Sequence, residues 1–212
     1  MMTAGRRLFA AAYDCLTAPA ERGWLGQRRE RLLAKACGTV LEIGSGTGAN
    51  LPHYQDVGDV RRIILAEPDP FMRAKLRPKL QLVSMPVEVI AAPAESLPCP
   101  DATVDTVVST LVLCTVADVT ASLAEIRRVL RPGGRLLFLE HVRGEGHAAR
   151  WQDWLEPIWR RVAAGCRPNR ATVAAIEDAG FAIDELEYFR LPLPQAALMP
   201  MVQGSARKTN RG

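Results

Sequence analysis

Short apolar runs alternate with amphipathic stretches along most of this chain. After Gly38, each apolar run is followed by a segment whose apolar residues recur at helical spacing. Continuous apolar runs are typical of strands buried on both faces of a parallel sheet, and the segments between them are typical of crossover helices. The pattern therefore predicts a doubly wound, Rossmann-like α/β fold with a seven-stranded, mostly parallel sheet and an antiparallel last strand.

The expected elements follow from this pattern. Strands are expected at Thr39–Ile43, Arg62–Glu67, Val87–Ala91, Val104–Thr110, Arg135–Val142, Ala182–Phe189 and Leu198–Ala206. Helices are expected at Asn50–Tyr54, Pro70–Leu80, Val119–Leu130, Trp151–Ala164 and Asn169–Ala179, the last ending at the natural helix stop Gly180. Residues from Thr3 to Lys35 read as additional helices, because Leu25, Leu32 and Leu33 recur at helical spacing.

Composition and charge exclude several classes of protein. A chain of 212 residues without a low-complexity linker is expected to form one domain. The net charge of +4 comes with arginines in "GQRRERLLAK" and "SARKTNRG", which we interpret as a scattered basic surface. An aromatic content of 6% is low for nucleic-acid binding, so none is expected. No apolar run is long enough to span a bilayer, and no signal peptide is recognised.

The five cysteines are scattered, with no CxxC pair and no metal-ligand spacing. An odd, scattered set of cysteines is typical of free thiols in a reducing compartment, so a cytoplasmic protein is expected. No group of histidine, aspartate and glutamate residues has metal-ligand spacing either, and no metal is expected. The oligomeric state stays open.

Two carboxylates accompany the glycine-rich stretch "VLEIGSGTGANL". Glu42 closes an apolar strand just before Gly44, Gly46 and Gly48, and Glu67 ends the next strand 19 residues after Gly48. Glycines let the main chain approach a ligand closely, whereas a carboxylate beside them would repel a pyrophosphate and suit a cation. A carboxylate at the second strand end can accept hydrogen bonds from a ribose. The pair fits an adenosine-bearing cation such as S-adenosylmethionine.

A nicotinamide enzyme is the rival interpretation. Gly44, Gly46 and Ala49 formally satisfy the pattern G-x-G-x-x-A, so the turn alone is weak evidence. The acid at Glu42 argues against a bound pyrophosphate.

Several ordered motifs resemble one known family. "VLEIGSGTG", "AEPDP", "DTVVSTLVLCTV" and "EIRRVLRPGGRLLFLEH" resemble the motifs of class I S-adenosylmethionine-dependent methyltransferases, in particular the type 11 group. "TLVLCTV", "RVLRPGGRLLFLEHV", "WQDWLEPIWRRVAAGC" and "GSARK" are similar to the mammalian membrane-associated alkyl-thiol methyltransferases and their soluble bacterial relatives. The mammalian members carry an amino-terminal hydrophobic anchor that this sequence does not show, so membrane association is not expected.

The resemblance implies roles for individual residues. It implies contacts with the methionine half of the cofactor for Glu42, Gly44, Gly46 and Gly48, and with the ribose for Glu67. It implies adenine contacts for Pro68, Met72, Ala94 and Glu95, and places Thr110 and Leu111 nearest the methyl group. In one place the chain departs from the family: Pro93 stands where many relatives have an aspartate that binds the adenine amine. Adenine recognition would then rest on backbone groups or on Glu95.

The acceptor site is expected around the end of the fifth strand. His141 is the candidate catalytic base, with a purely loop-orienting role equally open. Cys114 is interpreted as a small wall residue. Further acceptor contacts are expected from Trp151, Trp154 and Leu155 as an apolar roof, and from Tyr13 and Trp24 in a lid of amino-terminal helices.

The chain is thus divided into a helical lid (1–38), a cofactor-binding core (39–142), an acceptor-site insert (143–180) and carboxyl-terminal strands (181–212). The expected activity is methyl transfer to a small apolar acceptor, and S-methylation of a thiol is the first hypothesis. C- or O-methylation of a quinone or other aromatic metabolite, and cofactor binding without catalysis, are the alternatives.

Overall fold

The computed structural model describes residues 3–55, 57–163, 165–190 and 199–209. A seven-stranded sheet has the strand order β3-β2-β1-β4-β5-β7-β6. Strands β1 to β5 run parallel, and β7 lies antiparallel between β5 and β6. Their bounds are Gly38–Ile43 (β1), Val60–Ala66 (β2), Val87–Ile90 (β3), Val104–Thr110 (β4), Leu130–His141 (β5), Phe181–Phe189 (β6) and Met201–Lys208 (β7). The predicted fold class, including the antiparallel last strand, is confirmed.

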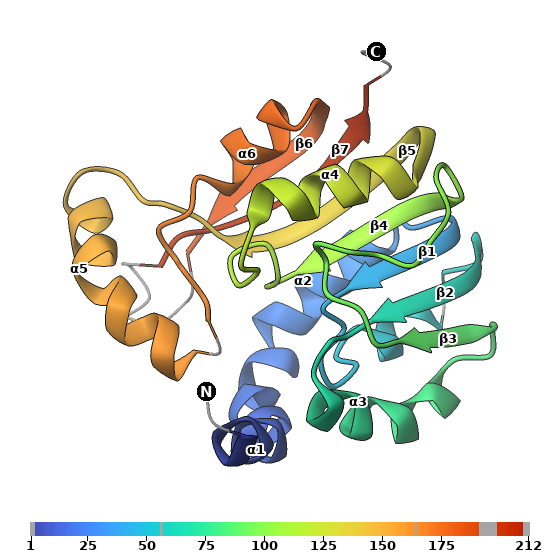
Figure 1. Ribbon diagram of the computed structural model, residues 1–212, viewed down its shortest axis with the longest axis horizontal. Coiled ribbons are helices and arrows are strands. Elements are labelled where there is room, and N and C mark those ends of the chain that lie inside the picture. Colours follow the sequence, from blue (N-terminus) through green and yellow to red (C-terminus); the bar gives the residue numbers. More distant parts are fainter. Residues whose placement is uncertain (1–2, 56, 164, 191–198, 210–212) are drawn as a thin grey trace.

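Helices cover both faces of the sheet (Figure 1). They are α1 (Thr3–Glu21), α2 (Trp24–Leu33), α3 (Pro70–Leu76), α4 (Val119–Val129), α5 (Gly146–Val162) and α6 (Thr172–Asp178), with 3-10 helices η1 (Leu51–Tyr54) and η2 (Arg77–Leu82). Helices α4 and α6 pack on one face, and α2, η1 and α3 on the other. Helix α5 projects from the carboxyl end of β5. None of the described helices is long and apolar enough to cross a membrane.

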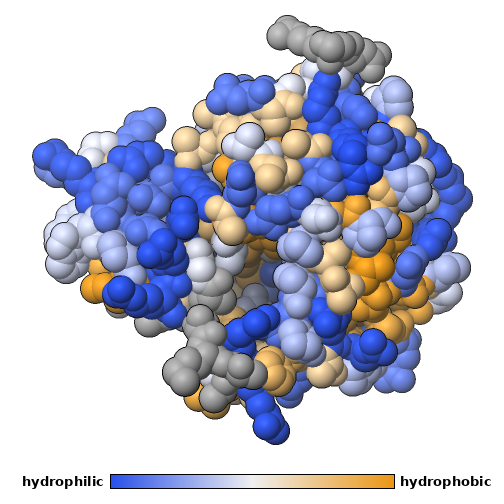
Figure 2. Space-filling view, in the orientation of Figure 1, coloured by the Kyte–Doolittle hydropathy of each residue, from blue (hydrophilic) through white to orange (hydrophobic). Residues whose placement is uncertain are grey.

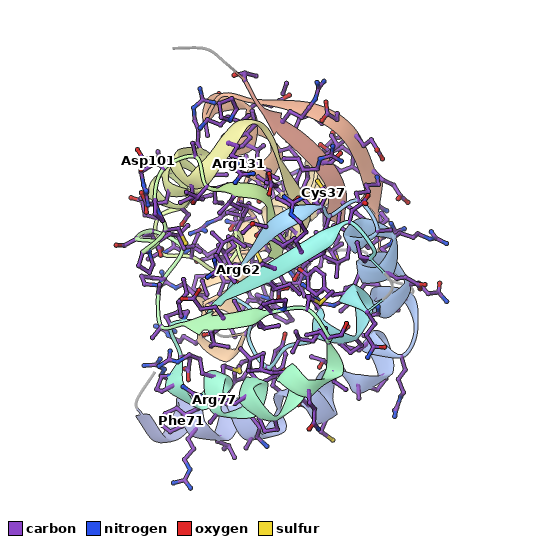
Figure 3. All side chains as sticks on the ribbon, turned by 90° about the vertical axis from the view of Figure 1, so that its right-hand side faces the viewer. Cys37, Arg62, Phe71, Arg77, Asp101 and Arg131 are labelled. Atoms are coloured by element: carbon purple, nitrogen blue, oxygen red, sulfur yellow. The ribbon has the colours of Figure 1, made fainter. Side chains whose placement is uncertain are left out.

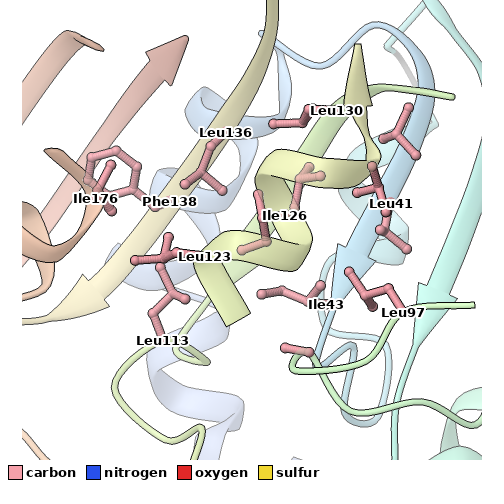
Figure 4. Close-up of a cluster of buried hydrophobic side chains, with 14 of the residues drawn as sticks. Leu41, Ile43, Leu97, Leu113, Leu123, Ile126, Leu130, Leu136, Phe138 and Ile176 are labelled. Atoms are coloured by element: carbon pink, nitrogen blue, oxygen red, sulfur yellow. The ribbon is translucent and has the colours of Figure 1, made fainter. Parts of the chain in front are cut away.

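Strand residues alternate between two cores because successive side chains point to opposite faces of a sheet. Leu41 and Ile43 pack beneath α4, whereas Val40 packs beneath α2. Figure 4 shows Leu123 and Ile126 of α4 lying over the sheet residues of the first core. Burying each such leucine or isoleucine contributes about 1.5–3 kcal/mol, so both layers stabilise the carboxyl ends of β1 and β4.

Several predicted element bounds are wrong for identifiable reasons. The helix expected over Pro70–Leu80 is α-helical only to Leu76 and continues as η2, because Pro78 cannot donate an i→i−4 hydrogen bond. Strand β5 begins at Leu130, which pairs with Val104 before an irregularity in the ladder. Helix α5 begins earlier than expected and α6 later. The expected ends at Leu198 and Ala164 lie outside the described residues.

The amino-terminal helices lie across the edge where β1 and β2 end. Ion pairs join α1 to the next layer, from Arg6 to Asp69 at 2.7 Å and from Asp14 to Lys79 at 2.8 Å. Figure 3, viewed from the right-hand side of Figure 1, shows the helical layer of α1 and α3 below β3, with Phe71 and Arg77 labelled in this layer. The expected helical segment 3–35 is confirmed as two helices that cover the strand ends.

Candidate active site

The glycine-rich loop after β1 adopts a conformation that few other residues tolerate. Gly44 and Gly46 both have φ +55. A Cβ on Gly44 would lie 2.6 Å from Cγ2 of Val112, so only glycine lets this loop pack against the turn after β4. A Cβ on Gly46 would meet nothing closer than 3.9 Å, so this glycine leaves open space beside the main chain. Gly44 therefore allows close packing of the loop, whereas Gly46 lies beside open space.

A small cavity of about 30 Å³ lies at this loop. It is lined by Tyr13, Arg29, Glu42, Gly44, Ser45, Gly46, Thr47, Ala49, Asn50 and Thr110. The Ser45 hydroxyl is buried and has no hydrogen-bond partner, an arrangement that costs free energy unless a ligand supplies one. A larger hollow of about 430 Å³ is lined by Glu30, His53 and Asp59, beside the start of β2. We assign the candidate site to the smaller cavity because it lies at the carboxyl ends of β1 and β4, where open α/β sheets bind ligands.

Helix α1 closes this cavity from outside. Tyr13 lines it, and Asp14 accepts a hydrogen bond from the Thr47 hydroxyl at 2.5 Å. Sites for nucleoside-sized ligands enclose at least ~300 Å³. The enclosed space at the loop is therefore only part of the volume that such a ligand occupies.

Glu42 is a buried carboxylate at the floor of the cavity. It is 2% exposed and accepts a hydrogen bond from the Tyr54 hydroxyl at 2.9 Å. Burial raises its pKa to about 7, although hydrogen bonds from Tyr54 and Asn50 and the charge of Arg29 act in the opposite direction. Glu42 thus carries only a partial negative charge at neutral pH, and an incoming cation would favour its ionised form.

Glu67 links the first two strand ends. It lies one residue beyond β2, and its carboxylate accepts hydrogen bonds from the backbone N–H groups of Gly46 at 2.8 Å and Asp69 at 2.7 Å. Burial raises the pKa of Glu67 despite these hydrogen bonds. Each oxygen keeps a second lone pair, so the carboxylate can still accept from a ligand.

The residues expected near an adenine are spread around this edge. Pro68 is exposed, Met72 is half-buried in α3 and Ala94 is buried. Glu95 accepts hydrogen bonds from the backbone N–H groups of Ala117 at 2.9 Å and Asp118 at 3.2 Å, so it holds the segment before α4. Their adenine contacts stay predictions.

Arg29 connects α2 to the cavity. We expected the amino-terminal arginines to form a scattered basic surface, and this expectation is wrong for Arg29. It is 2% exposed and donates two hydrogen bonds of 2.9 Å to the carboxylate of Glu21. Its Nη1 also donates to Asn50 at 2.8 Å and to Thr110 at 2.9 Å. The sequence carried a signal for this role, because Arg29 shares its helix face with the buried residues Leu25, Leu32 and Leu33.

A turn after β4 is held by one buried carboxylate. Glu140 is fully buried and accepts from the Ser109 hydroxyl at 2.7 Å. It also accepts from three backbone N–H groups, those of Val112, Leu113 and Cys114, at 3.0 to 3.2 Å. Leu111, at the start of this turn, has φ +63, a strained value for a non-glycine residue. Glu140 therefore holds the strained turn in which Thr110 and Leu111 were expected to approach a ligand.

Two cysteines and a histidine meet beside this turn. The Sγ atoms of Cys114 and Cys166 are 3.6 Å apart, and Nδ1 of His141 lies 3.7 Å and 3.6 Å from them. Burial lowers the pKa of His141, but the hydrogen bond and charge of Cys114 outweigh it and the pKa lies above its usual value. The role of Cys114 as a wall residue stays a prediction, and its buried sulfur also contacts three polar groups, those of Thr115, His141 and Cys166. Cys166 was not anticipated as a site residue.

The structure separates the predicted acceptor residues. Trp151 and Trp154 pack edge to face at 5.5 Å on the outer side of α5, where they are 50% and 66% exposed. Trp24 packs against Phe189 and does not line the cavity. Figure 2 shows the surface hollowed between the lobe that carries α5 and the body of the molecule. Of the predicted site residues, the cavity unites Tyr13, Glu42, Gly44, Gly46 and Thr110.

Two further predicted residues stand apart from the cavity. A Cβ on Gly48 would lie 2.7 Å from Leu76, so this glycine serves core packing. Leu155 is half-buried on α5. Their ligand contacts stay predictions.

Comparisons with known proteins point to one group. A family described as a methyltransferase domain matches residues 41–138. The human thiol S-methyltransferase TMT1A is 35% identical over 175 residues, which cover 80% of this chain and 70% of that protein. The ubiquinone/menaquinone biosynthesis C-methyltransferase UbiE of an Enterobacter strain is 40% identical over 105 residues, 48% of this chain and 42% of that protein.

A solved structure from Thermotoga maritima, described as an SAM-dependent methyltransferase and possible histamine N-methyltransferase, has the same fold. It superposes with a TM-score of 0.70 at 21% identity and covers 96% of this chain and 97% of that one. At this identity the likeness speaks for the fold alone.

Proposed function

The chain belongs to the class I S-adenosylmethionine-dependent methyltransferases, and from this premise we propose that it methylates the sulfur of a small apolar thiol. One observation carries the choice of acceptor. The relatives named as thiol S-methyltransferases match across 80% of the chain, including segments beyond the methyltransferase domain, whereas the match to UbiE covers 48%. C-methylation of a quinone is therefore the second candidate.

The residues around the cavity fit S-adenosylmethionine. This cofactor supplies a methyl group on a sulfonium, which is already activated toward a nucleophile. The buried carboxylate of Glu42 suits a cationic ligand, and the unpaired Ser45 hydroxyl needs a polar partner. We propose that Glu42 and the glycine loop hold the methionine half, and that Glu67 accepts from the ribose hydroxyls.

A thiol acceptor needs little activation by the protein, so the main requirement is its alignment with the methyl group. A thiol of pKa about 8.5 costs roughly 2 kcal/mol to ionise at neutral pH, whereas a phenol of pKa about 10 costs roughly 4 kcal/mol. Alignment of two reactants is worth ~7–11 kcal/mol, so positioning dominates the rate. The chain's own contribution is thus to hold the acceptor in line and to exclude water.

The proposed acceptor is tested with matched substrates. An alkyl thiol of pKa about 8.5 and a phenol of pKa about 10, of similar size and each supplied with S-adenosylmethionine, should differ by about 30-fold or more in kcat/KM, in favour of the thioether. Product is measured by mass spectrometry. Methylation of quinones without any thioether would favour the second candidate, and cofactor binding without turnover on either panel would leave a binding protein.

Glu67→Ala is expected to weaken binding of S-adenosylhomocysteine by ~1.5–3 kcal/mol, or about 10- to 150-fold, because hydrogen bonds to a charged acceptor are lost. Calorimetric titration measures the change. Glu88→Ala is the matched control, since Glu88 is an exposed acid on the neighbouring strand β3 paired with Arg62. Equal affinities for a folded Glu67 variant and the wild type would remove Glu67 from the site.

Cofactor binding is expected to tighten as pH rises from 6 to 8. With a pKa of about 7, Glu42 must lose a proton before it can attract a cation, so each pH unit below 7 costs up to ~tenfold in affinity. Above that pKa the carboxylate is already ionised and the affinity levels off. Glu42→Gln should flatten the pH profile, with S-adenosylmethionine titrated at pH 6, 7 and 8. A flat wild-type profile would contradict the assignment.

A further inference from the structure

Three potential metal ligands come together from three separate segments of the chain. Cys114 lies in the turn after β4, His141 ends β5 and Cys166 follows α5. Their sulfur and Nδ1 atoms all lie within 4.8 Å of one another. Across the described residues this is the group whose spacing suits a metal ion.

The triangle has the dimensions of one face of a zinc tetrahedron. Zinc–sulfur bonds of about 2.3 Å and zinc–nitrogen bonds of about 2.0–2.1 Å place two sulfurs about 3.8 Å apart, and a sulfur and a nitrogen about 3.6 Å apart. The observed separations are 3.6 Å between the sulfurs, and 3.6 and 3.7 Å from each sulfur to Nδ1. A zinc ion can be seated on these atoms with shifts of a few tenths of an ångström.

Hydrogen bonds of the surrounding backbone fix the positions of the three segments that carry Cys114, His141 and Cys166. The N–H of Cys114 donates to Glu140 at 3.2 Å, and its carbonyl accepts from the N–H of Arg167 at 2.8 Å. The carbonyl of His141 accepts from the Thr172 hydroxyl at 3.3 Å. The Arg170 guanidinium donates to the carbonyls of Leu113 and Val116 at 2.5 Å each, which ties the Cys166 segment to the Cys114 turn. The ligand atoms are therefore positioned before any ion binds.

A buried donor stands beside the triangle. Nε1 of Trp159 is buried near the sulfur of Cys166, and no described group forms a hydrogen bond of normal geometry with it. Groups that orient a metal ligand by hydrogen bonding are a regular part of metal sites. A thiolate at Cys166 would give this N–H an acceptor.

We propose that Cys114, His141 and Cys166 bind a zinc ion through Sγ, Nδ1 and Sγ, and that its fourth position takes the acceptor sulfur. Two cysteine thiolates balance the charge of Zn²⁺, and three protein ligands with one open position are typical of catalytic zinc sites. The second half of the proposal rests on the thiol methyltransferase function. It reverses the expectation of a metal-free site and makes His141 a ligand and not a general base.

The proposed zinc site and the candidate cofactor cavity adjoin the same turn after β4. Thr110, the last residue of β4, lines that cavity, and Cys114 follows it by four residues in the turn, where the Thr115 hydroxyl donates to the carbonyl of Leu111 at 3.0 Å. An acceptor held at the zinc would thus face the side on which Thr110 meets the cofactor.

The chemical step balances without an oxidant or reductant. On coordination the acceptor thiol gives its proton to solvent, because a coordinated thiol is deprotonated. A lone pair of its sulfur then forms the new carbon–sulfur bond, while the methyl–sulfonium bond breaks and leaves its electron pair on the departing thioether. The neutral methylated product is a weak zinc ligand and dissociates.

The test begins with the full chain purified in reductant and without chelator. Elemental analysis should find about one zinc per chain. Cys114→Ser and Cys166→Ser should lose that zinc, while Cys99→Ser, a buried cysteine outside the triangle, should keep it. In the cobalt-substituted protein, the thiolate-to-cobalt absorption should shift when a thiol acceptor is added and stay unchanged with the alcohol of the same skeleton.

Each other outcome overturns a defined part of the proposal. Wild-type protein without stoichiometric zinc, or with a Cys114–Cys166 disulfide in its place, overturns the metal site irrespective of how the variants fold. If the purified protein contains zinc but the absorption of its cobalt-substituted form does not change when a thiol is added, the proposed acceptor position at the metal is refuted. Removal of zinc should lower kcat/KM about 30-fold for a thiol of pKa about 8.5 and less for acidic thiols. Full thiol methylation without zinc leaves the proposed function standing, whereas stoichiometric zinc without any thiol methylation refutes the function alone.

Discussion

Glu140→Ala is expected to lower the free energy of unfolding by about 3–6 kcal/mol. The substitution leaves the buried backbone N–H groups of Leu113 and Cys114 and the partly buried one of Val112 without an acceptor, at about 1–2 kcal/mol each. The Ser109 hydroxyl loses its partner as well. Because the same turn carries the strained residue Leu111, the variant should also lose affinity for S-adenosylhomocysteine. Urea denaturation gives the first quantity and calorimetric titration the second.

A matched control separates this effect from the loss of any acid in the region. Glu145 precedes α5, is exposed and makes no side-chain capping hydrogen bond. Glu145→Ala should therefore change stability by less than ~0.5 kcal/mol. Glu140→Gln should lie between the two, since one amide oxygen still accepts. A loss below 1 kcal/mol in Glu140→Ala would show that water replaces the carboxylate and that the turn is not held by it.

The second large effect is expected for Arg29→Met, at about 3–5 kcal/mol of unfolding free energy. Arg29 is buried and the Glu21 side chain is 20% exposed, so the substitution leaves the partly buried charge of Glu21 without its bidentate partner. Asn50 and Thr110 lose a donor at the same time. The connection between α1 and the cavity should loosen, so limited proteolysis should cut between α1 and α2 sooner than in the wild type.

The comparison variant for Arg29 lies on the same helix. Arg31 is exposed, and Arg31→Met should stay within ~0.5 kcal/mol of the wild type. Adding Glu21→Gln to Arg29→Met should recover part of the loss, because the uncompensated charge disappears. If the two substitutions were additive instead, the ion pair would not be the source of the effect.

The architecture was predictable because it depends on local patterns. Continuous apolar runs separated by amphipathic helices specify a parallel sheet, and β4 has the predicted bounds, Val104–Thr110. The positions of Glu42 and Glu67 at two neighbouring strand ends followed from the same pattern, and the structure joins them through the glycine loop. Errors occurred at Pro78 and around Leu130, where chain geometry and ladder pairing override hydrophobic spacing.

The arrangement of the polar groups was only partly visible in the sequence. Arg29 stood among exposed arginines, and its burial depends on the partners that α1, the glycine loop and β4 supply. The partners of Glu140 likewise come from the end of β4 and the turn after it, 26 to 31 residues earlier. Such contacts depend on strand order and loop packing, which no local pattern contains.

The sequence by itself determined the fold class, the family and the cofactor, because apolar periodicity, turn glycines and ordered motifs act over short stretches of chain. Only the tertiary structure decided which distant side chains meet. Cys114 and His141 are 27 residues apart, and Cys166 follows His141 by 25. They converge because β4 and β5 are neighbours in the sheet and the segment after α5 folds back over the turn after β4. Spacing along the chain cannot reveal such a site, since its geometry is set by packing between elements.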